Sequence, residues 1–157
     1  MKVGIISDSH DNLPLIRAAL CAFADAGAEA IVHAGDIISP FAARELLGAG
    51  LPLYAVYGNN DGEKKELPAI LEGIRPGPRK FTLGAKRFLL VHDRGALSPG
   101  DLEGVDILVY GHTHGYRVEP GPPLAVNPGE SCGWVTGSPT AALLDTESME
   151  VSKILLE

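Results

Sequence analysis

The chain has 157 residues, of which 45% are hydrophobic and 21% are charged, and its formal net charge is −7. This length fits one domain (residues 1–157) with a buried core, and the two cysteines lack the CxxC spacing of a disulfide framework or zinc knuckle. The acidic charge argues against an extended nucleic-acid-binding surface. The lack of a ~18-residue apolar run or a secretory signal predicts a cytoplasmic protein without membrane contact.

The first half of the chain alternates strands and helices. Strands are predicted at residues 2–7, 30–33 and 52–56, and helices near residues 13–25, 40–47 and 63–71. Asn12 and Ser39 are the candidate N-caps of the first two helices, which are expected to end at Gly27 and Gly48. This βαβαβα order predicts a parallel sheet with right-handed crossovers.

The second half of the chain is dominated by strands. They are predicted at residues 79–83, 86–91, 107–110, 116–119, 124–126, 140–144 and 150–155. Gly84-Ala85 has the character of a two-residue hairpin loop. Because few helices interrupt these strands, we expect a second, mixed sheet packed on the first, and an exposed edge strand of this sheet could pair in a homo-oligomer. The expected fold class is α/β, with two packed mixed β-sheets flanked by helices.

Side chains that can bind metals follow these apolar runs at the points where the strands end. The seven candidates are Asp8, His10, Asp36, Asn59, His92, His112 and His114. Open α/β sheets bind ligands at the carboxyl ends of their strands, so we expect these side chains to gather where the two halves of the chain meet. Gly35, Gly58 and Gly111 each directly precede a candidate, and glycine permits the close backbone approach that a crowded centre requires.

The number and spacing of these donors favour two ions over one. Asp8 and His10 are two residues apart, as are His112 and His114, so in extended backbone the members of each pair point the same way. Seven donors exceed the needs of one tetrahedral ion and suit two ions ~3.5–4 Å apart. Mixed imidazole and carboxylate ligands favour manganese, iron, zinc or cobalt over magnesium or calcium.

The ordered motifs resemble those of the calcineurin-like metallophosphoesterases. They are Asp8-Ser-His10, Gly35-Asp36, Gly58-Asn-Asn-Asp61, Val91-His92 and Gly111-His-Thr-His114. The small size and the Asn127-Pro-Gly129 segment resemble the compact bacterial and archaeal phosphodiesterase branch, which is related to the small retromer subunit of eukaryotes. The likeness extends from Asp8 to Asn127 and therefore covers essentially the whole chain.

This resemblance implies a four-layer α/β/β/α sandwich with a binuclear centre. One ion would be held by Asp8, His10, Asp36 and His114. The other would be held by Asp36, Asn59, His92 and His112, with Asp36 as the bridge. The implied mechanism is in-line attack on phosphorus by a metal-bound hydroxide, in which Asp36, Asn59 and His92 act through the metals. Manganese is the first expectation for the two ions, with iron, zinc, cobalt or nickel as alternatives.

Three positions depart from the family pattern. Asn60 stands where many members carry a histidine that protonates the leaving group, and an amide cannot donate that proton at neutral pH, so we expect a preference for good leaving groups. Asp93 replaces the usual glycine after His92; it either caps the next loop, which we favour, or adds a carboxylate behind the imidazole. Glu130 is inserted before the expected serine, which puts any phosphate-orienting role of that loop in doubt.

Other conspicuous residues have simpler interpretations. His33 is expected to be a buried or supporting histidine rather than a ligand, and Asp61 is expected to cap a helix or form a local turn. Cys21 is expected to be a small buried hydrophobic residue, and Cys132 is given no role. Trp134 fits the core and a partner or lid contact equally well.

Two functions from different classes are therefore considered. The first is hydrolysis of a small phosphodiester by a binuclear metal-dependent phosphodiesterase. The second is a non-catalytic protein-interaction scaffold on the same fold, like the retromer subunit with its weakened metal site. The presence of all seven ligand types favours the enzyme, because a scaffold has no need of them, while the missing acid at Asn60 favours the scaffold.

Overall fold

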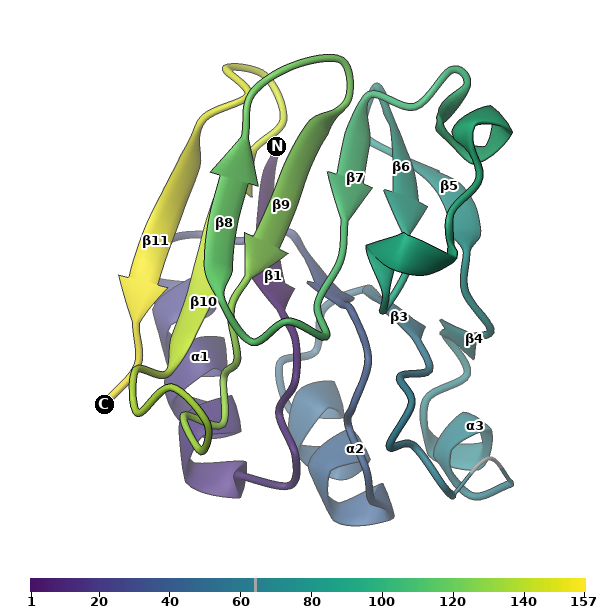
Figure 1. Ribbon diagram of the computed structural model, residues 1–157. Helices are drawn as coiled ribbons and strands as arrows, with labels where there is room; N and C mark the ends of the chain where they lie inside the picture. The colour runs from purple at the N-terminus through teal and green to yellow at the C-terminus, as the bar shows by residue number, and fades with distance from the viewer. Residues whose placement is uncertain (64) are drawn as a thin grey trace.

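The computed structural model describes residues 1–63 and 65–157, which form two β-sheets packed face to face (Figure 1). The strands of the first sheet are β1 (Lys2–Ile6), β2 (Ala30–His33), β3 (Leu53–Val56), β4 (Ile74–Arg75), β10 (Thr140–Asp145) and β11 (Val151–Leu155). Those of the second are β5 (Arg79–Leu83), β6 (Lys86–Leu90), β7 (Ile107–Val109), β8 (Tyr116–Glu119) and β9 (Leu124–Pro128). Their spatial orders are β11-β10-β1-β2-β3-β4 and β5-β6-β7-β9-β8.

The first two helices follow the predicted bounds. They are α1 (Leu13–Asp25) and α2 (Pro40–Leu47). The side chain of Asn12 accepts a hydrogen bond from the Leu15 amide at 3.4 Å, and Ser39 Oγ accepts one from the Phe41 amide at 3.2 Å. Each cap satisfies an amide that has no partner within its helix, so the helix begins there. The parallel pairing of β1 with β2 and of β2 with β3 confirms the predicted parallel sheet.

The helix predicted at residues 63–71 is wrong in length, because α3 spans only Leu67–Ile70. Pro68 explains the difference. Its ring clashes with the carbonyl four residues earlier in a continuous helix, so proline is tolerated only in the first turn. Lys64, which belongs to the predicted helix, lies outside the described residues. The chain then forms β4, which pairs parallel with β3 and is too short for its sequence to predict.

The predicted assignment of the last two strands to the second sheet is also wrong. β10 pairs antiparallel with β1, and β11 pairs antiparallel with β10, so both extend the first sheet. Four of the six residues of β10 are buried, which requires cover on both faces, whereas β11 is largely exposed and forms the edge. The predicted hairpin of β5 and β6 is confirmed.

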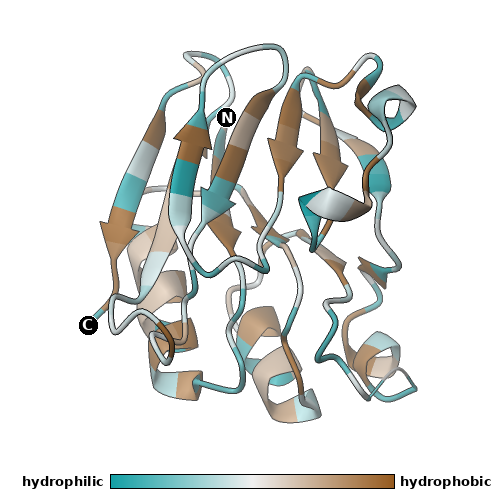
Figure 2. Cartoon of the chain, in the orientation of Figure 1, coloured by the Kyte–Doolittle hydropathy of each residue, from teal (hydrophilic) through white to brown (hydrophobic). Residues whose placement is uncertain are grey.

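The main hydrophobic core lies between the two sheets. Val3 and Val32 of the first sheet and Phe88, Val109 and Val126 of the second belong to it, and Figure 2 shows hydrophobic residues along β7 and most of β9. The helices α1, α2 and α3 cover the outer face of the first sheet through further buried clusters. Two short 3-10 helices, η1 (Arg94–Ala96) and η2 (Pro99–Leu102), form the layer beside the second sheet. Within the described residues, no helix has the length and apolar character that a membrane span requires.

Candidate metal centre

The seven candidate ligands gather at one end of the two sheets. Asp8 and His10 follow β1, Asp36 follows β2, Asn59 follows β3, His92 follows β6, and His112 and His114 follow β7. The strands β1, β2 and β3 run parallel to one another, as do β6 and β7, so the carboxyl ends within each set point the same way (Figure 1). Short contacts join all seven side chains. The role of these side chains as metal ligands stays a prediction.

The first set of donors consists of Asp8, His10 and His114 and is called the Asp8 group. Asp8 Oδ1 lies 3.6 Å from His114 Nε2, and the rings of His10 and His114 are stacked with centroids 5.5 Å apart. The other carboxylate oxygen, Asp8 Oδ2, accepts hydrogen bonds from Ser7 Oγ at 2.6 Å and from the His112 amide at 3.1 Å. Those two bonds hold the carboxylate so that Oδ1 is left for another partner.

The second set consists of Asn59, His92 and His112 and is called the Asn59 group. Asn59 Oδ1 lies 2.9 Å from His92 Nε2 and 2.9 Å from His112 Nδ1. His92 Nδ1 is 2.8 Å from the carbonyl oxygen of Ala34, which only accepts, so Nδ1 donates. In a neutral imidazole the lone pair on His92 Nε2 then faces an amide oxygen, and two facing acceptors are suited to a shared cation.

Asp36 lies between the two groups. Its Oδ2 is 3.5 Å from His10 Nε2 and 3.5 Å from His92 Nε2, which is the position that a bridging carboxylate requires. The backbone amide of Asn60 donates to Asp36 Oδ1 at 2.8 Å, and its side-chain Nδ2 donates to Oδ2 at 2.7 Å. Asn60 therefore holds the central carboxylate, a role that the comparison with a family histidine did not reveal.

The backbone is strained at most of these positions. Five candidates have a positive φ: Asp8 at 49°, His10 at 39°, Asp36 at 59°, His112 at 67° and His114 at 60°. Residues with a Cβ occupy this left-handed region at a cost of about 1–3 kcal/mol each, and they do so mainly where function requires it. The turns after β1, β2 and β7 are thus formed in an unfavourable backbone conformation, which brings these side chains into the centre.

Two glycines are required by close packing around the carboxylates. A Cβ at Gly58 would collide with the carboxylate and amide of Asp36, and a Cβ at Gly111 would collide with Ser7 and Asp8. Neither glycine has a positive φ, so it is the close approach of the backbone that excludes a side chain.

The unpaired atoms of the Asp8 group fit a metal cation. Within the described residues, the buried atoms Asp8 Oδ1 and His10 Nε2 lack a hydrogen-bond partner. Burial raises the pKa of Asp8 above its usual range, because desolvation of the carboxylate outweighs the hydrogen bond from Ser7 and the nearby His92 and His114. Ligand atoms of Asp8, His10 and Asp36 lie within 4.8 Å of one another. A divalent ion would satisfy both unpaired atoms and the buried charge.

Glu130 is the residue of this centre that sequence reasoning missed. It is fully buried, and its Oε2 lies 2.8 Å from His114 Nδ1. The carboxylate also accepts hydrogen bonds from Thr136 Oγ1 at 2.6 Å and from the Val135 amide at 3.0 Å. Burial alone would raise the pKa of Glu130, but the hydrogen bonds from Thr136 and His114 outweigh it and lower the pKa to about 2. Metal-binding histidines usually donate their second N–H to such a carboxylate, which fixes the ring.

The position of Glu130 just after a predicted strand could have identified it as a residue of this centre. Glu130 follows β9, which pairs parallel with β7, so it emerges at the same end of the sheets as the seven candidates. The prediction noted the insertion of Glu130 and used it only to doubt a phosphate contact.

Two buried residues beside the centre support its backbone. His33 Nε2 lies 3.0 Å from Ser9 Oγ and Nδ1 accepts from the Gly35 amide at 3.1 Å, which confirms a satisfied buried histidine. Burial lowers the pKa of His33 to about 3, so the ring is neutral. Asp61 accepts a hydrogen bond from the Gly58 amide at 2.7 Å, which confirms the predicted local turn. It also accepts one from the Asp36 amide at 3.0 Å, a contact between distant segments that the sequence did not predict.

The remaining singled-out residues lie at the surface. Asp93 Oδ1 accepts from the Gly95 amide at 2.7 Å and caps η1, which confirms the favoured interpretation. Trp134 is 69% exposed and therefore does not belong to the core. Cys21 is exposed, so its predicted burial is wrong; the buried face of α1 consists of Ile16, Ala19 and Phe23, and residue 21 points away from it.

A cleft of about 230 Å³ borders the Asn59 group. Asn59, His92 and His112 contribute to its wall. The rest of the wall is formed by Tyr57, Gly58, Gly77, Val91, Asp93 and Ala96. None of these lining residues is lysine or arginine, so a phosphate bound here would depend on metal cations for positive charge.

Residues 1–149 match the sequence model of the calcineurin-like phosphoesterase superfamily domain. The chain belongs to this superfamily. It is 40% identical over 167 aligned residues to a phosphodiesterase of Methanocaldococcus jannaschii, with all of both chains covered. Among solved structures, that of an archaeal phosphodiesterase matches with a TM-score of 0.88 and 37% identity, covering 99% of this chain and 100% of the other.

A second structural likeness is more distant. Zinc-bound Vps29 of Entamoeba histolytica matches with a TM-score of 0.69 and 17% identity, covering 99% of each chain. At that identity the likeness shows the fold alone. The compact phosphoesterase branch and the α/β fold of two mixed sheets with helices are thus confirmed.

Proposed function

We propose that the protein is a binuclear metal-dependent phosphodiesterase that acts on small phosphodiesters. The observation that carries this proposal is the position of Asp36 Oδ2, 3.5 Å from a histidine of the Asp8 group and 3.5 Å from a histidine of the Asn59 group. The phosphodiesterase relative at 40% identity supports the same reaction class.

The residues divide into two ligand sets. The Asp8 group with Asp36 would hold one ion, and the Asn59 group with Asp36 would hold the other. When bound, such ions activate water for attack on phosphorus and offset the charge of the phosphoryl group. Manganese is our first candidate, because imidazole and carboxylate donors suit it, and iron, zinc, cobalt and nickel are the alternatives.

The cleft beside the Asn59 group would receive one ester substituent of the substrate. Tyr57, Val91 and Ala96 give its wall apolar surface, and its volume of about 230 Å³ fits a small group. Asn60 donates to Asp36 and cannot protonate a leaving group. The protein therefore favours aryl or other substituents that leave readily without a proton.

The test is hydrolysis of bis(p-nitrophenyl) phosphate by chelator-stripped protein before and after addition of Mn²⁺. We expect no turnover without metal and restored turnover with it, in the wild type and in Asp106→Asn. This control removes the charge of an exposed ion pair with Arg87 (3.0 Å) at the amino-terminal end of β7. The matched variant Asp36→Asn should stay inactive under both conditions.

The scaffold alternative predicts a different result. If no turnover follows addition of manganese, iron, cobalt, nickel or zinc, the phosphodiesterase proposal fails and capture of a protein partner becomes the next experiment. Turnover of p-nitrophenyl phosphate alone, without the diester, would keep the metal centre and contradict the proposed substrate class.

A further inference from the structure

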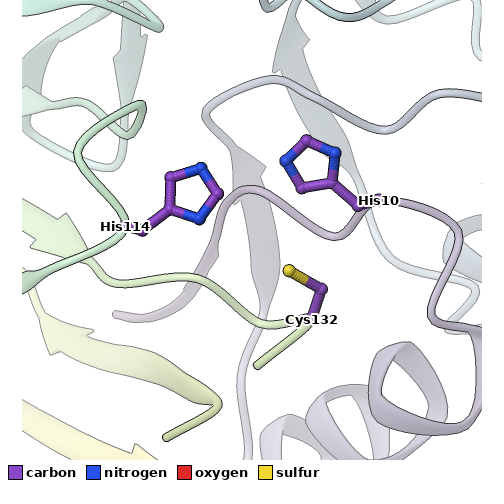
Figure 3. Close-up of side chains that lie close together, drawn as sticks. All are labelled: His10, His114 and Cys132. Carbon is purple, nitrogen blue, oxygen red and sulfur yellow. The ribbon is translucent and has the colours of Figure 1, made fainter. Parts of the chain in front are cut away.

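A buried thiol lies beside the Asp8 group. The side chain of Cys132 is 2% exposed, and ligand atoms of Cys132, His10 and His114 all lie within 4.8 Å of one another. Figure 3 shows the sulfur directed toward the space between the two imidazole rings. The calcineurin-like motifs identified above include no sulfur donor.

The backbone holds this thiol in place from two sides. The amide of Cys132 donates to the carbonyl of Asp8 at 3.2 Å, and its carbonyl accepts from Asn12 Nδ2 at 2.9 Å. One residue earlier, the amide of Ser131 donates to the carbonyl of Ser7 at 3.0 Å. The segment that carries Cys132 is therefore docked along the turn that carries Asp8 and His10.

Two further atoms point to a cation next to this thiol, in the group of Asp8, His10 and Asp36 that shares His10 with the thiol's group. Asp8 is fully buried and its Oδ1 lacks a hydrogen-bond partner among the described residues, as does His10 Nε2. Asp8 Oδ1 lies 3.6 Å from His114 Nε2, one of the rings that flank the thiol. The thiol also donates a weak hydrogen bond to Glu130 Oε2 at 3.2 Å, which a metal–sulfur bond would replace.

We propose that Cys132 is a ligand of the ion held by the Asp8 group. On binding, a metal–sulfur bond forms, the S–H bond breaks, and the proton is released to solvent. Thiolate is a soft ligand, so this ion would be zinc, cobalt or iron in preference to manganese, and the two ions of the centre would differ. The inference rests on the proposed metal centre but not on its catalytic activity.

The experiment is titration of chelator-stripped protein with Co²⁺, followed by absorption spectroscopy and metal analysis. A direct cobalt–thiolate bond produces a charge-transfer band in the near ultraviolet. The chain has two cysteines. Cys21 is exposed on α1, so Cys21→Ser is the matched control and leaves Cys132 as the sole thiol. We expect the band in the wild type and in Cys21→Ser, and its loss in Cys132→Ser.

The outcomes separate the two proposals. Binding of two cobalt ions without a thiolate band in Cys21→Ser would overturn the Cys132 assignment while leaving the metal centre intact. Failure of the wild type to bind cobalt would overturn both. Because the Cys21→Ser spectrum alone identifies the sulfur, the assignment stays testable even if Cys132→Ser does not fold.

A second readout measures metal preference. In a competition between Zn²⁺ and Mn²⁺, we expect Cys132→Ser to lose at least ~10-fold in zinc affinity relative to the wild type, the low end of the loss seen when only an outer partner of a metal ligand is removed. The affinity for manganese should change far less. An unchanged zinc preference would contradict a sulfur ligand.

Discussion

The two halves of the metal centre differ in how deeply they are enclosed. The Asp8 group is built around a carboxylate with no exposed surface, and Glu130 behind His114 is equally buried. In the Asn59 group, Asn59 and His112 are exposed and His92 is 5% exposed, and all three border the cleft of about 230 Å³. Because the Asp8 carboxylate is buried and the Asn59 group borders the cleft, we expect the first half to retain its ion more firmly and the second to meet the substrate.

This difference also extends to the supporting contacts. His114 of the Asp8 group is held by a carboxylate that itself accepts hydrogen bonds from Thr136 and Val135. The Nδ1 atom of His92 in the Asn59 group is held by a backbone carbonyl, that of Ala34, instead of a carboxylate. We therefore expect a chelator to remove the ion of the Asn59 group first. Asp36 lies between the two halves. Variants of Asp36 and its neighbours therefore distinguish changes that weaken both ions from changes that weaken one.

The largest effect is expected for Asp36→Asn. It replaces the carboxylate whose Oδ2 faces both His10 and His92, so both ions should weaken together and diester turnover should fall by about 10³-fold or more. Metal analysis after dialysis measures occupancy, and Asp106→Asn serves as the control. Full occupancy by two ions in Asp36→Asn would contradict the bridging position and remove the link between the two halves.

Glu130→Gln should affect one half only. The charge behind His114 is lost, so the ion of the Asp8 group should bind about 10–100-fold more weakly while the other ion is retained. Isothermal titration with Zn²⁺ resolves the two steps. Glu45→Gln, which breaks an exposed ion pair with Arg17 at 2.6 Å, should bind both ions as the wild type does. Equal weakening of both ions would mean that Glu130 supports the fold generally.

Asn60→Ala should have a smaller effect on the bridge. It removes the side-chain bond to Asp36 Oδ2 but keeps the backbone bond to Oδ1, and a hydrogen bond to a charged group contributes about 1.5–3 kcal/mol. Turnover of an activated aryl diester should fall by about 10- to 150-fold, as steady-state kinetics would measure. A loss as complete as that of Asp36→Asn would refute the view of Asn60 as a support.

Much of this centre was predictable from local sequence. Each candidate follows an apolar run that forms a strand, and neighbouring parallel strands bring their carboxyl ends together, so the convergence of Asp8 and Asp36 after β1 and β2 follows from pattern alone. The caps of α1 and α2 are equally local, since Asn12 and Ser39 bond to amides two or three residues away.

What escaped prediction depends on contacts between distant segments. Asn60 bonds to Asp36, 24 residues away, and Glu130 bonds to His114, 16 residues away through the pairing of β9 with β7. The buried residues of β10 do not predict that it pairs with β1, because any strand covered on both faces has such a burial pattern. Single-sequence reasoning identifies where a strand ends, but not which strand lies beside it.

The smallest effect on the centre is expected from His33, whose main contribution is to stability. Burial lowers its pKa to about 3 from 6.5, so between these values the unfolded chain binds more protons than the folded one. The contribution of His33 is therefore fully present above pH 6.5 and is lost as the pH falls, by up to about 1.4 kcal/mol per pH unit.

His33→Gln should reduce this dependence, because glutamine does not titrate. Urea unfolding of the metal-free wild type and variant at several pH values between 7.5 and 5 measures the slope. The variant should retain its metal, because both ring nitrogens of His33 are used by Ser9 and Gly35 and neither faces the two donor groups. An unchanged slope would mean that the neutral buried ring is not what couples stability to pH, and loss of metal would make His33 part of the centre.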